Sequence, residues 1–507
     1  MKKQPLLIIA LVCLTSVAFG GGIVTNTNQS AAWVRTLVRD ASTDADAVYF
    51  NPAGIIKLND GFHFSLNNQT IFQNKVVTDN YQFLNSSPKK YSGEVKAPLF
   101  PGLYASWKKN RFAVSFGFNP IGGGGGAEYK NGLPSFEASV SDIVPILQVA
   151  LAPLDAVLSL PQPAGYGFNP EFSNITGYSA DIYFKGTSVF FGYQLGISYK
   201  LSNSIGLFAG ARYITAKNTY VGSIRNVQII ASPVAPGVPL YNVPAGSYTP
   251  GGYLRAVAGA DGLPAIQVAT LNDYADALDA ATDVVVDAEE SGTGFAPILG
   301  ANISIGENLN IGLKYEFSTR LNLKQKVTPG KDGGGIFVQD STVHSDMPAM
   351  ISAGIRYQVI PRLSISAGFH YFFDKSVNYG KTLDSTGVQV VNDKVIDHNT
   401  YEISLGLEYN ITEKLIISGG YLFAKSGVSE DYQSDMSFDL SSNTFGVGFC
   451  YRFSKNLSIN TGVAYSIYNE GEKKYLHVMD EVGLEIPAKE TFQIDNIILG
   501  IGVDFSF

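Results

Sequence analysis

Long stretches of this chain alternate strictly between apolar and polar residues, which is the pattern of a β-strand with one face against apolar surroundings. One stretch places Leu309, Ile311, Leu313, Tyr315 and Phe317 on one face, and Asn310, Gly312, Lys314, Glu316 and Ser318 on the other. The pattern predicts about fourteen strands, at 61–76, 91–108, 110–118, 178–200, 203–224, 291–305, 307–327, 341–359, 361–378, 395–411, 413–429, 435–454, 456–471 and 489–507. Many exceed the about five to six residues of strands in globular proteins, and they suit tilted strands that span a membrane.

The connections between the predicted strands alternate between tight turns and longer loops. The tight turns fall at Lys109, Leu201-Ser202, Gly306, Ile360, Thr412 and Lys455, and the two longest loops at 119–177 and 225–290. An even number of antiparallel strands with short turns at one end and long loops at the other is typical of a bacterial outer-membrane barrel. We therefore predict an all-β fold, a 14-stranded antiparallel transmembrane β-barrel over residues 61–507, with both termini in the periplasm.

A soluble β-sandwich or propeller is the alternative, because both also contain many strands with regular turns. Such a fold would carry charge on its outer faces, whereas only 16% of these residues are charged and the polar faces are rich in Gly and Ser. Aromatic residues gather at the predicted strand ends, as expected for the girdles of a membrane barrel. The last strand ends at Phe507, so we expect the outer-membrane assembly machinery and outer-membrane lipid as partners, and a monomer.

The remaining composition excludes other classes of protein. A net charge of -8 argues against a nucleic-acid partner. Two Cys and five scattered His make a disulfide scaffold or a Cys/His metal site unexpected. There is no Gly-x-Ser-x-Gly, Walker or His-Glu-x-x-His motif. We therefore expect no cofactor and no enzymatic activity.

The first sixty residues contain two segments without strand alternation. Residues 1–20 combine Lys2 and Lys3, an apolar run at 6–14 and the sequence Ala18-Phe19-Gly20, which predicts a signal peptide and export. Residues 21–60 follow before the first strand. A barrel of about fourteen strands encloses a lumen that is either filled with water or plugged, so we predict that this segment folds inward as a plug, or hatch.

Several sequences resemble the FadL-type transporters of long-chain fatty acids and hydrocarbons. They are Gln29-Ser30-Ala31-Ala32, Asp44-Ala45-Asp46-Ala47, Asn51-Pro52-Ala53-Gly54-Ile55, Met347-Pro348-Ala349 and the strand sequences at 401–409 and 415–421. The resemblance implies a periplasmic hatch closed by Asn51, Pro52, Ala53 and Gly54. It also implies uptake of hydrophobic small molecules, which leave sideways through a gap opened by a kink in the third strand.

The third predicted strand, 110–118, is short and precedes a run of glycines at 122–126. Pro lacks the backbone donor of a ladder and Gly weakens strand pairing, so a break in the wall is expected near Gly117, Asn119 and Pro120. A flexible start of the following loop is an equal alternative.

Both long loops carry apolar residues at helical spacing. Ser141-Asp142 could cap a helix that ends before Pro153, and Leu271, Tyr274, Leu278, Ala281 and Val285 share one face of another. These helices either form an apolar groove at the outer surface or merely cap the barrel mouth.

Cations on the polar faces of the strands are candidates to bind the head group of a carboxylate ligand. They are Arg212, Lys314 and Arg356, and by the resemblance also Lys381. Ion pairs inside the wall, with Glu316, Glu402 or Glu408, are the alternative role. The predicted function is uptake of hydrophobic compounds such as long-chain fatty acids by facilitated diffusion. The main alternative is a diffusion porin, which would have a charged constriction and no plug, and an outer-membrane enzyme is the weaker one.

Overall fold

The computed structural model describes residues 23–158, 175–231, 245–259, 263–281, 283–381 and 392–507. The predicted signal peptide at 1–20 lies outside these residues. The described strands form one antiparallel sheet that closes on itself, because the first strand pairs with the last from His63–Ser506 to Asp79–Glu490. Closure removes the free edges that an open sheet would present.

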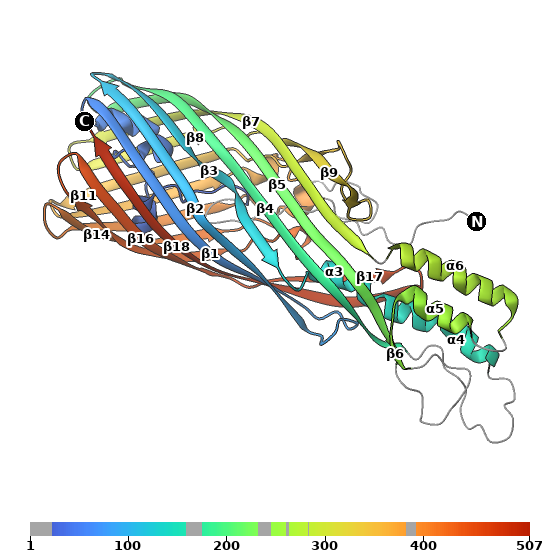
Figure 1. Ribbon diagram of the computed structural model, residues 1–507. Coiled ribbons are helices and arrows are strands. Elements are labelled where there is room, and N and C mark those ends of the chain that lie inside the picture. The colour runs from blue at the N-terminus through green and yellow to red at the C-terminus, as the bar shows by residue number, and fades with distance from the viewer. Residues whose placement is uncertain (1–22, 159–174, 232–244, 260–262, 282, 382–391) are drawn as a thin grey trace.

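Fourteen of the described strands build the barrel wall, as predicted (Figure 1). They are β1 (Gly61–Asp79), β2 (Lys89–Lys109), β3 (Phe112–Tyr129), β4 (Ile175–Lys200), β5 (Ile205–Ala231), β7 (Val284–Ile305), β8 (Leu309–Glu316), β11 (Met350–Ile360), β12 (Leu363–Phe372), β13 (Tyr401–Asn410), β14 (Leu415–Lys425), β15 (Ser442–Arg452), β16 (Leu457–Tyr468) and β18 (Leu484–Ser506). Four further strands extend the wall locally, namely β6 (Gly246–Tyr248), β9 (Asn322–Asp332), β10 (Thr342–His344) and β17 (Gly471–Met479).

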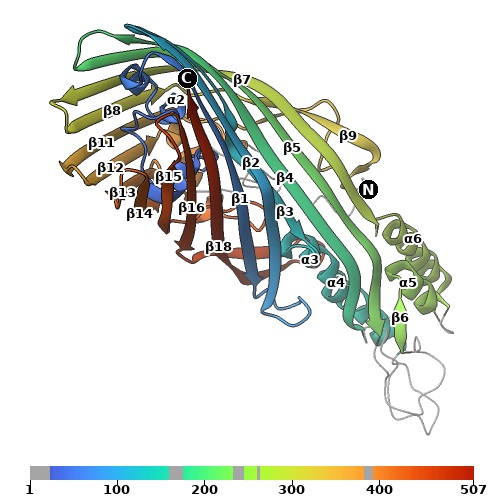
Figure 2. The ribbon, with the colours of Figure 1, turned by 60° about the vertical axis from the view of Figure 1, so that its left-hand side comes forward.

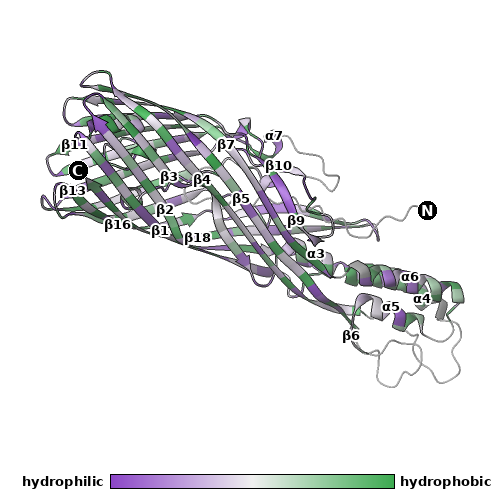
Figure 3. Ribbon diagram, turned by 45° about the horizontal axis from the view of Figure 1, so that its top comes forward, coloured by the Kyte–Doolittle hydropathy of each residue, from purple (hydrophilic) through white to green (hydrophobic). Residues whose placement is uncertain are grey.

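Alternating side chains point outward and inward along each strand, as the sequence pattern requires. On β18, Ile497, Leu499 and Ile501 are exposed on the outside, whereas the alternate residues Asn496 and Ile498 are buried. Figure 3 shows green hydrophobic bands on the wall strands. The exposed apolar residues form a belt of the kind that contacts lipid in a membrane barrel.

The two ends of the barrel differ. The six predicted tight turns lie at one end, which we call the turn end, together with the C-terminus (Figure 1). The other end, which we call the loop end, carries the helical loops. Their helices are α3 (Pro134–Ser141), α4 (Ile143–Leu158), α5 (Pro250–Ala258), α6 (Ala265–Ala281), η2 (Asp374–Ser376), α7 (Asn392–Val395) and η3 (Glu430–Tyr432). The run Pro134–Leu154 is long and apolar enough to span a membrane by composition, but half of it is buried within the protein.

Residues 23–60 lie inside the barrel, where Figure 2 shows them in blue behind the wall strands. They contain α1 (Ala31–Thr36), α2 (Ala47–Phe50) and η1 (Pro52–Lys57). Ser30 caps α1, because its side chain accepts a hydrogen bond from the backbone N–H of Trp33. Nearly every residue from Ile23 to Ile56 is buried. We call residues 23–60 the hatch.

Several sequence predictions about single elements were wrong. Val285, predicted on a helix face, lies in β7, and the predicted strand 341–359 is divided into β10 and β11. The third strand does not end at 118 but continues to Tyr129, because β3 keeps pairing with β4 through bulges on either side of Gly122. The predicted strand 307–327 is divided into β8 and β9. It breaks beside Pro297 of β7, which accepts a hydrogen bond from Phe317 but cannot donate one back.

A further correction concerns Pro153, which does not end a helix. It lies inside α4. The carbonyl that loses its donor belongs to Val149, which is exposed, so water can satisfy it.

Candidate functional site

The ladder between β2 and β3 is interrupted in the middle of the wall. The two strands pair from Lys109–Phe112 to Leu103–Phe118 and again from Val95–Ala127 to Gly93–Tyr129, with a register shift between. The facing stretches 96–102 and 119–126 are not paired with each other. Pro98 and Pro101 on β2 and Pro120 on β3 lie in these stretches and have no N–H to donate. The wall therefore has a gap here, which we call the β2–β3 gap.

The hatch occupies the free edge of β3 that faces the gap. The Asn26 N–H donates to the Ile121 carbonyl at 2.8 Å, and the Gly123 N–H donates to the Val24 carbonyl at 3.3 Å. A Cβ added at Gly122 would lie 2.5 Å from the Val24 oxygen, so the close approach requires glycine. The first described residues of the hatch thus replace β2 as the partner of β3.

Two side chains reinforce this contact. Gln29 donates from Nε2 to the Pro120 carbonyl at 2.9 Å, and Asn119 donates from Nδ2 to Gln29 Oε1 at 2.7 Å. The predicted exit residues Asn119 and Pro120 therefore lie at the gap and contact the hatch. Gly117 is one rung away, paired with Tyr104 and facing Val48 of the hatch.

An ion pair joins α1 of the hatch to the opposite part of the wall. The Arg35 guanidinium lies 2.8 Å from Glu408 on β13, and both side chains are nearly inaccessible to solvent, at 4% and 10%. Arg35 also donates to Asn460 and Ser418, each at 3.0 Å. Glu408 accepts a second cation, Arg356, at 3.2 Å.

A buried histidine makes a second bridge between hatch and wall. His370 on β12 contacts Asp40 of the hatch through Nε2 at 2.7 Å and Glu402 on β13 through Nδ1 at 2.6 Å. Within the hatch, Arg39 holds Asp46 at 2.8 Å and Asp44 at 2.6 Å. Arg39 lowers the pKa of Asp44 below its ordinary value, although the Asp44 side chain is 54% exposed. The hatch is thus held by charged and polar contacts as well as by its buried apolar side chains.

Asn51 precedes η1, and Pro52, Ala53 and Gly54 form the first turn of η1. Asn51 donates from Nδ2 to the Ser42 carbonyl at 2.9 Å and to Asn302 Oδ1 on β7 at 2.7 Å. The Pro52 carbonyl accepts from Ser198 on β4 at 2.7 Å, and Ala53 is buried in a small apolar cluster with Phe208 and Ile298. These contacts fix the hatch turn to the wall.

Three of the four predicted ligand cations contact the hatch or its partners. Arg212 pairs with Glu316, and its guanidinium lies 5.1 Å from the centre of the Tyr49 ring. Lys314 donates to the Tyr49 carbonyl at 2.9 Å, and Arg356 pairs with Glu408. Lys381 is separate, because its ammonium group lies 3.9 Å from the centre of the Tyr432 ring in the η3 loop, and it donates to the Tyr432 carbonyl at 3.0 Å.

Sequence reasoning missed Lys75, a fully buried cation on the inner face of β1. Its ammonium group lies 4.7 Å from the centre of the Phe438 ring. The sequence did contain a signal for Lys75. It follows Ile71 and Gln73 at alternate positions of the first predicted strand, so it points to the same face as they do. Among the described residues, no cluster of His, Cys, Asp and Glu fits a metal ion.

Helix α3 is anchored over the loop end by two carboxylates. Glu137 accepts from Lys89 at 2.6 Å, from Tyr91 at 2.9 Å and from Tyr178 at 2.7 Å. Asp142, at the junction of α3 and α4, accepts from Tyr81 at 2.6 Å and contacts His477 at 2.7 Å. The helix therefore sits on the wall as a fixed cover.

Comparison with known proteins adds to this geometry. The family model described as "Outer membrane protein transport protein (OMPP1/FadL/TodX)" matches residues 11–507. Two curated relatives, both outer membrane protein P1 of Haemophilus influenzae, are 21% identical over 233 and 229 residues. The alignments cover 45% and 42% of this chain and 50% and 47% of the relatives. The chain thus spans about half the length of the curated relatives it matches.

Two solved structures share the fold. A FadL homologue of Pseudomonas aeruginosa has a TM-score of 0.57 at 14% identity, covering 97% of this chain and 100% of that one. The toluene transporter TodX of P. putida has a TM-score of 0.50 at 15% identity, covering 91% and 94%. At these identities the likeness concerns the fold alone.

Proposed function

Because the chain belongs to the OMPP1/FadL/TodX family of bacterial outer-membrane transport proteins, a family of transporters and not of enzymes, we propose that it takes up hydrophobic small molecules. The loop end faces the medium and both termini lie in the periplasm. The terminal aromatic Phe507, stacked 5.3 Å from Phe62 and 5.8 Å from Phe64, serves recognition by the assembly machinery.

The β2–β3 gap is the observation that supports a sideways route. Cargo that reaches the lumen passes between residues 96–102 and 119–126 into the bilayer. Three prolines and a glycine-rich stretch in these segments keep the two strands from pairing. Beside the gap, Phe118 stacks on Phe191 at a centroid distance of 5.5 Å and lies tilted against Tyr193 at 5.1 Å. These rings offer an apolar surface at the edge of the gap.

The energetics of hydrophobic cargo favour such a route. Transfer of each methylene from an apolar site to water costs about 0.8 kcal/mol. A chain of about ten methylenes would therefore lose roughly 8 kcal/mol if it were released into the periplasm. Exit into the hydrocarbon core of the membrane avoids this cost.

The hatch is the proposed gate of this route. Its residues 24–29 cover the lumenal side of the gap, so they have to move before cargo passes. While the hatch is closed, its Tyr49 accepts from Lys314 and lies over Arg212, and its Arg35 shares Glu408 with Arg356. We propose that these three cations of the wall meet a carboxylate head group only after that movement, and that Lys381 contacts cargo nearer the loop end.

A cross-link across the gap tests the sideways route. Lys96 and Gly126 are the next facing residues beyond the Val95–Ala127 rung, so Lys96→Cys with Gly126→Cys extends the ladder into the gap. The native Cys450 is replaced by Ala in this background. The matched control joins Leu405→Cys to Tyr421→Cys, which are register partners in the intact β13–β14 ladder.

Uptake of a labelled fatty acid and of toluene is measured in cells before and after reduction of the disulfide. We expect oxidation to block uptake through the gap variant and reduction to restore it, while the control transports normally. Normal uptake through the oxidised gap variant would show that cargo does not leave between β2 and β3.

A diffusion porin is the competing function. The buried hatch argues against it, since residues 23–60 fill the lumen that a porin keeps open. Liposomes that contain the protein should therefore exclude small sugars. Rapid swelling in a sugar solution would favour the porin.

A further inference from the structure

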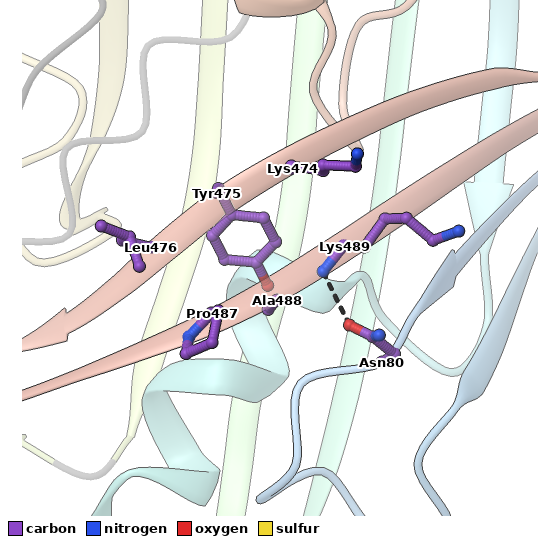
Figure 4. Close-up of a pocket in the computed structure, with 7 residues that line it drawn as sticks. All are labelled: Asn80, Lys474, Tyr475, Leu476, Pro487, Ala488 and Lys489. Carbon is purple, nitrogen blue, oxygen red and sulfur yellow. Dashed lines mark hydrogen bonds between the residues drawn. The ribbon is translucent and has the colours of Figure 1, made fainter.

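A hollow of ≈ 470 Å³ lies at the β17–β18 hairpin of the loop end (Figure 4), where the side chains of Lys474, Leu476 and Pro487 are exposed. The hollow is lined by residues 474–476 of β17, residues 487–489 of β18 and Asn80 beyond the end of β1. The proposed transport function makes no use of these residues.

Two lysines face each other across this hairpin. Lys474 and Lys489 are register partners, and like charges directly opposite one another destabilise a strand pair. The repulsion is offset at Lys489, whose ammonium group pairs with Glu472 at 3.1 Å. In the part of the chain that the structure describes, no ion pair is found for Lys474. The protein as a whole is acidic, with a net charge of -8, so a general excess of lysine does not explain the pair.

The rim of the hollow offers further donors and an apolar floor. The Lys489 N–H donates to Asn80 Oδ1 at 2.6 Å, which orients the Asn80 side chain and leaves its amide nitrogen as a donor (Figure 4). Leu476 is 60% exposed, and Pro487 opposite it is also exposed. Two ammonium groups, an amide nitrogen and an apolar patch suit a phosphorylated sugar, whose phosphate accepts hydrogen bonds and whose ring has an apolar face.

The height of the hollow above the membrane identifies the source of such a sugar. The apolar belt on the outside of β18 ends at Ile497, and Asp495 and Gln493 follow it. Lys489 lies eight residues further along (497 − 489), which is roughly 26 Å of strand at about 3.3 Å per residue. With a strand tilt of about 45°, this places Lys489 roughly 18 Å above the belt.

Phospholipid head groups extend only about 5–8 Å beyond the hydrocarbon core. The hollow therefore stands at the level of the sugar chains that a glycolipid of the outer leaflet carries. We infer that it binds the phosphorylated core sugar of this glycolipid, lipopolysaccharide, and that Lys474 is the main phosphate ligand.

Binding of purified lipopolysaccharide to the purified full-length protein in detergent tests this assignment. The variants are Lys474→Ala and Lys474→Glu, and the matched control is Lys414→Ala in a tight turn at the opposite end. An exposed charge contact of this kind corresponds to an affinity change of about fivefold. We expect that loss for Lys474→Ala, a larger one for Lys474→Glu and none for Lys414→Ala.

Three comparisons complete the test. Dephosphorylated lipopolysaccharide should bind the unmodified protein as weakly as native lipopolysaccharide binds Lys474→Ala. Inorganic phosphate at millimolar concentration should not displace the glycolipid. Thermal unfolding without glycolipid should be unchanged or shifted upward in Lys474→Ala, because the opposed charge is gone.

Equal binding of dephosphorylated lipopolysaccharide, displacement by inorganic phosphate, or an equal loss in Lys414→Ala would each overturn the assignment. Uptake of hydrophobic cargo should be the same in all three variants. A failure of the glycolipid assignment would therefore leave the proposed transport function unaffected, and the reverse also holds.

Discussion

The Arg35–Glu408 pair should determine how firmly the hatch is closed, and Arg35→Met tests this with little change in side-chain volume. The substitution leaves Glu408 buried with Arg356 at 3.2 Å as its remaining cation. It also removes the hydrogen bonds to Asn460 and Ser418. Removing one partner of a buried ion pair costs about 3–5 kcal/mol. Because Arg356 still compensates Glu408 in part, we take the lower value, about 3 kcal/mol.

A loss of about 3 kcal/mol corresponds to an increase of roughly 100-fold in the open fraction of the hatch. Hydrogen exchange of the α1 amides, followed by mass spectrometry of peptides from residues 31–38, measures this directly. The matched control is Lys217→Met, whose pair with Glu289 at 2.8 Å is 57% and 40% exposed and contributes at most about 1 kcal/mol. The reasoning would be refuted if α1 exchanged as slowly in Arg35→Met as in this control.

Three further changes probe the loop 426–441, the helices α3 and α4 and the hatch turn. Burial raises the pKa of Asp439 to about 6 from 3.8, so its stabilising protonated form is fully present below pH 3.8 and is lost as the pH rises through about 6. The loop 426–441 should resist protease better at pH 5 than at pH 8, and Asp439→Asn should abolish the difference. Asp142→Asn should weaken the contact with His477 and cost about 1–3 kcal/mol, seen as faster proteolysis of α3 and α4 at unchanged barrel stability. Gly54→Ala would place a Cβ 2.5 Å from Asn51 Nδ2 and should open the hatch, seen as sugar leakage into liposomes.

The alternation of apolar and polar residues was enough to predict the barrel, because each strand position faces either lipid or lumen. It also located the tight turns, where the chain has only a few residues in which to reverse. It failed where pairing depends on a partner far away in the sequence. The glycines of β3 suggested an end at 118, yet β4 and the hatch both pair with that stretch and carry the strand on to Tyr129.

For the candidate site, the alternation of side chains along each strand predicted only which face of the wall a residue points to. This alternation placed Arg212, Lys314 and Arg356 on the inner face, which is confirmed by their burial or partial burial. It did not say at what height along the lumen each cation meets the hatch, and so it could not separate a free cation from a paired one. The bridge from His370 to Asp40 joins residues 330 positions apart, and no local pattern contains that information.

The chemistry of the hatch surface is consistent with a plug that has to leave its seat and return. Breaking an apolar contact exposes its surface to water at a cost of about 25 cal/mol per Å². An exposed apolar patch also favours association with other chains. Arg35 and Asp40 instead gain water when they separate from Glu408 and His370 on the wall, which offsets much of the lost attraction. The same property makes the closed state dependent on good geometry, since a buried charge without its partner is costly. The hatch also buries Trp33, Val34 and Leu37 in the apolar core, so the charged contacts lower the cost of release only at the positions that they occupy.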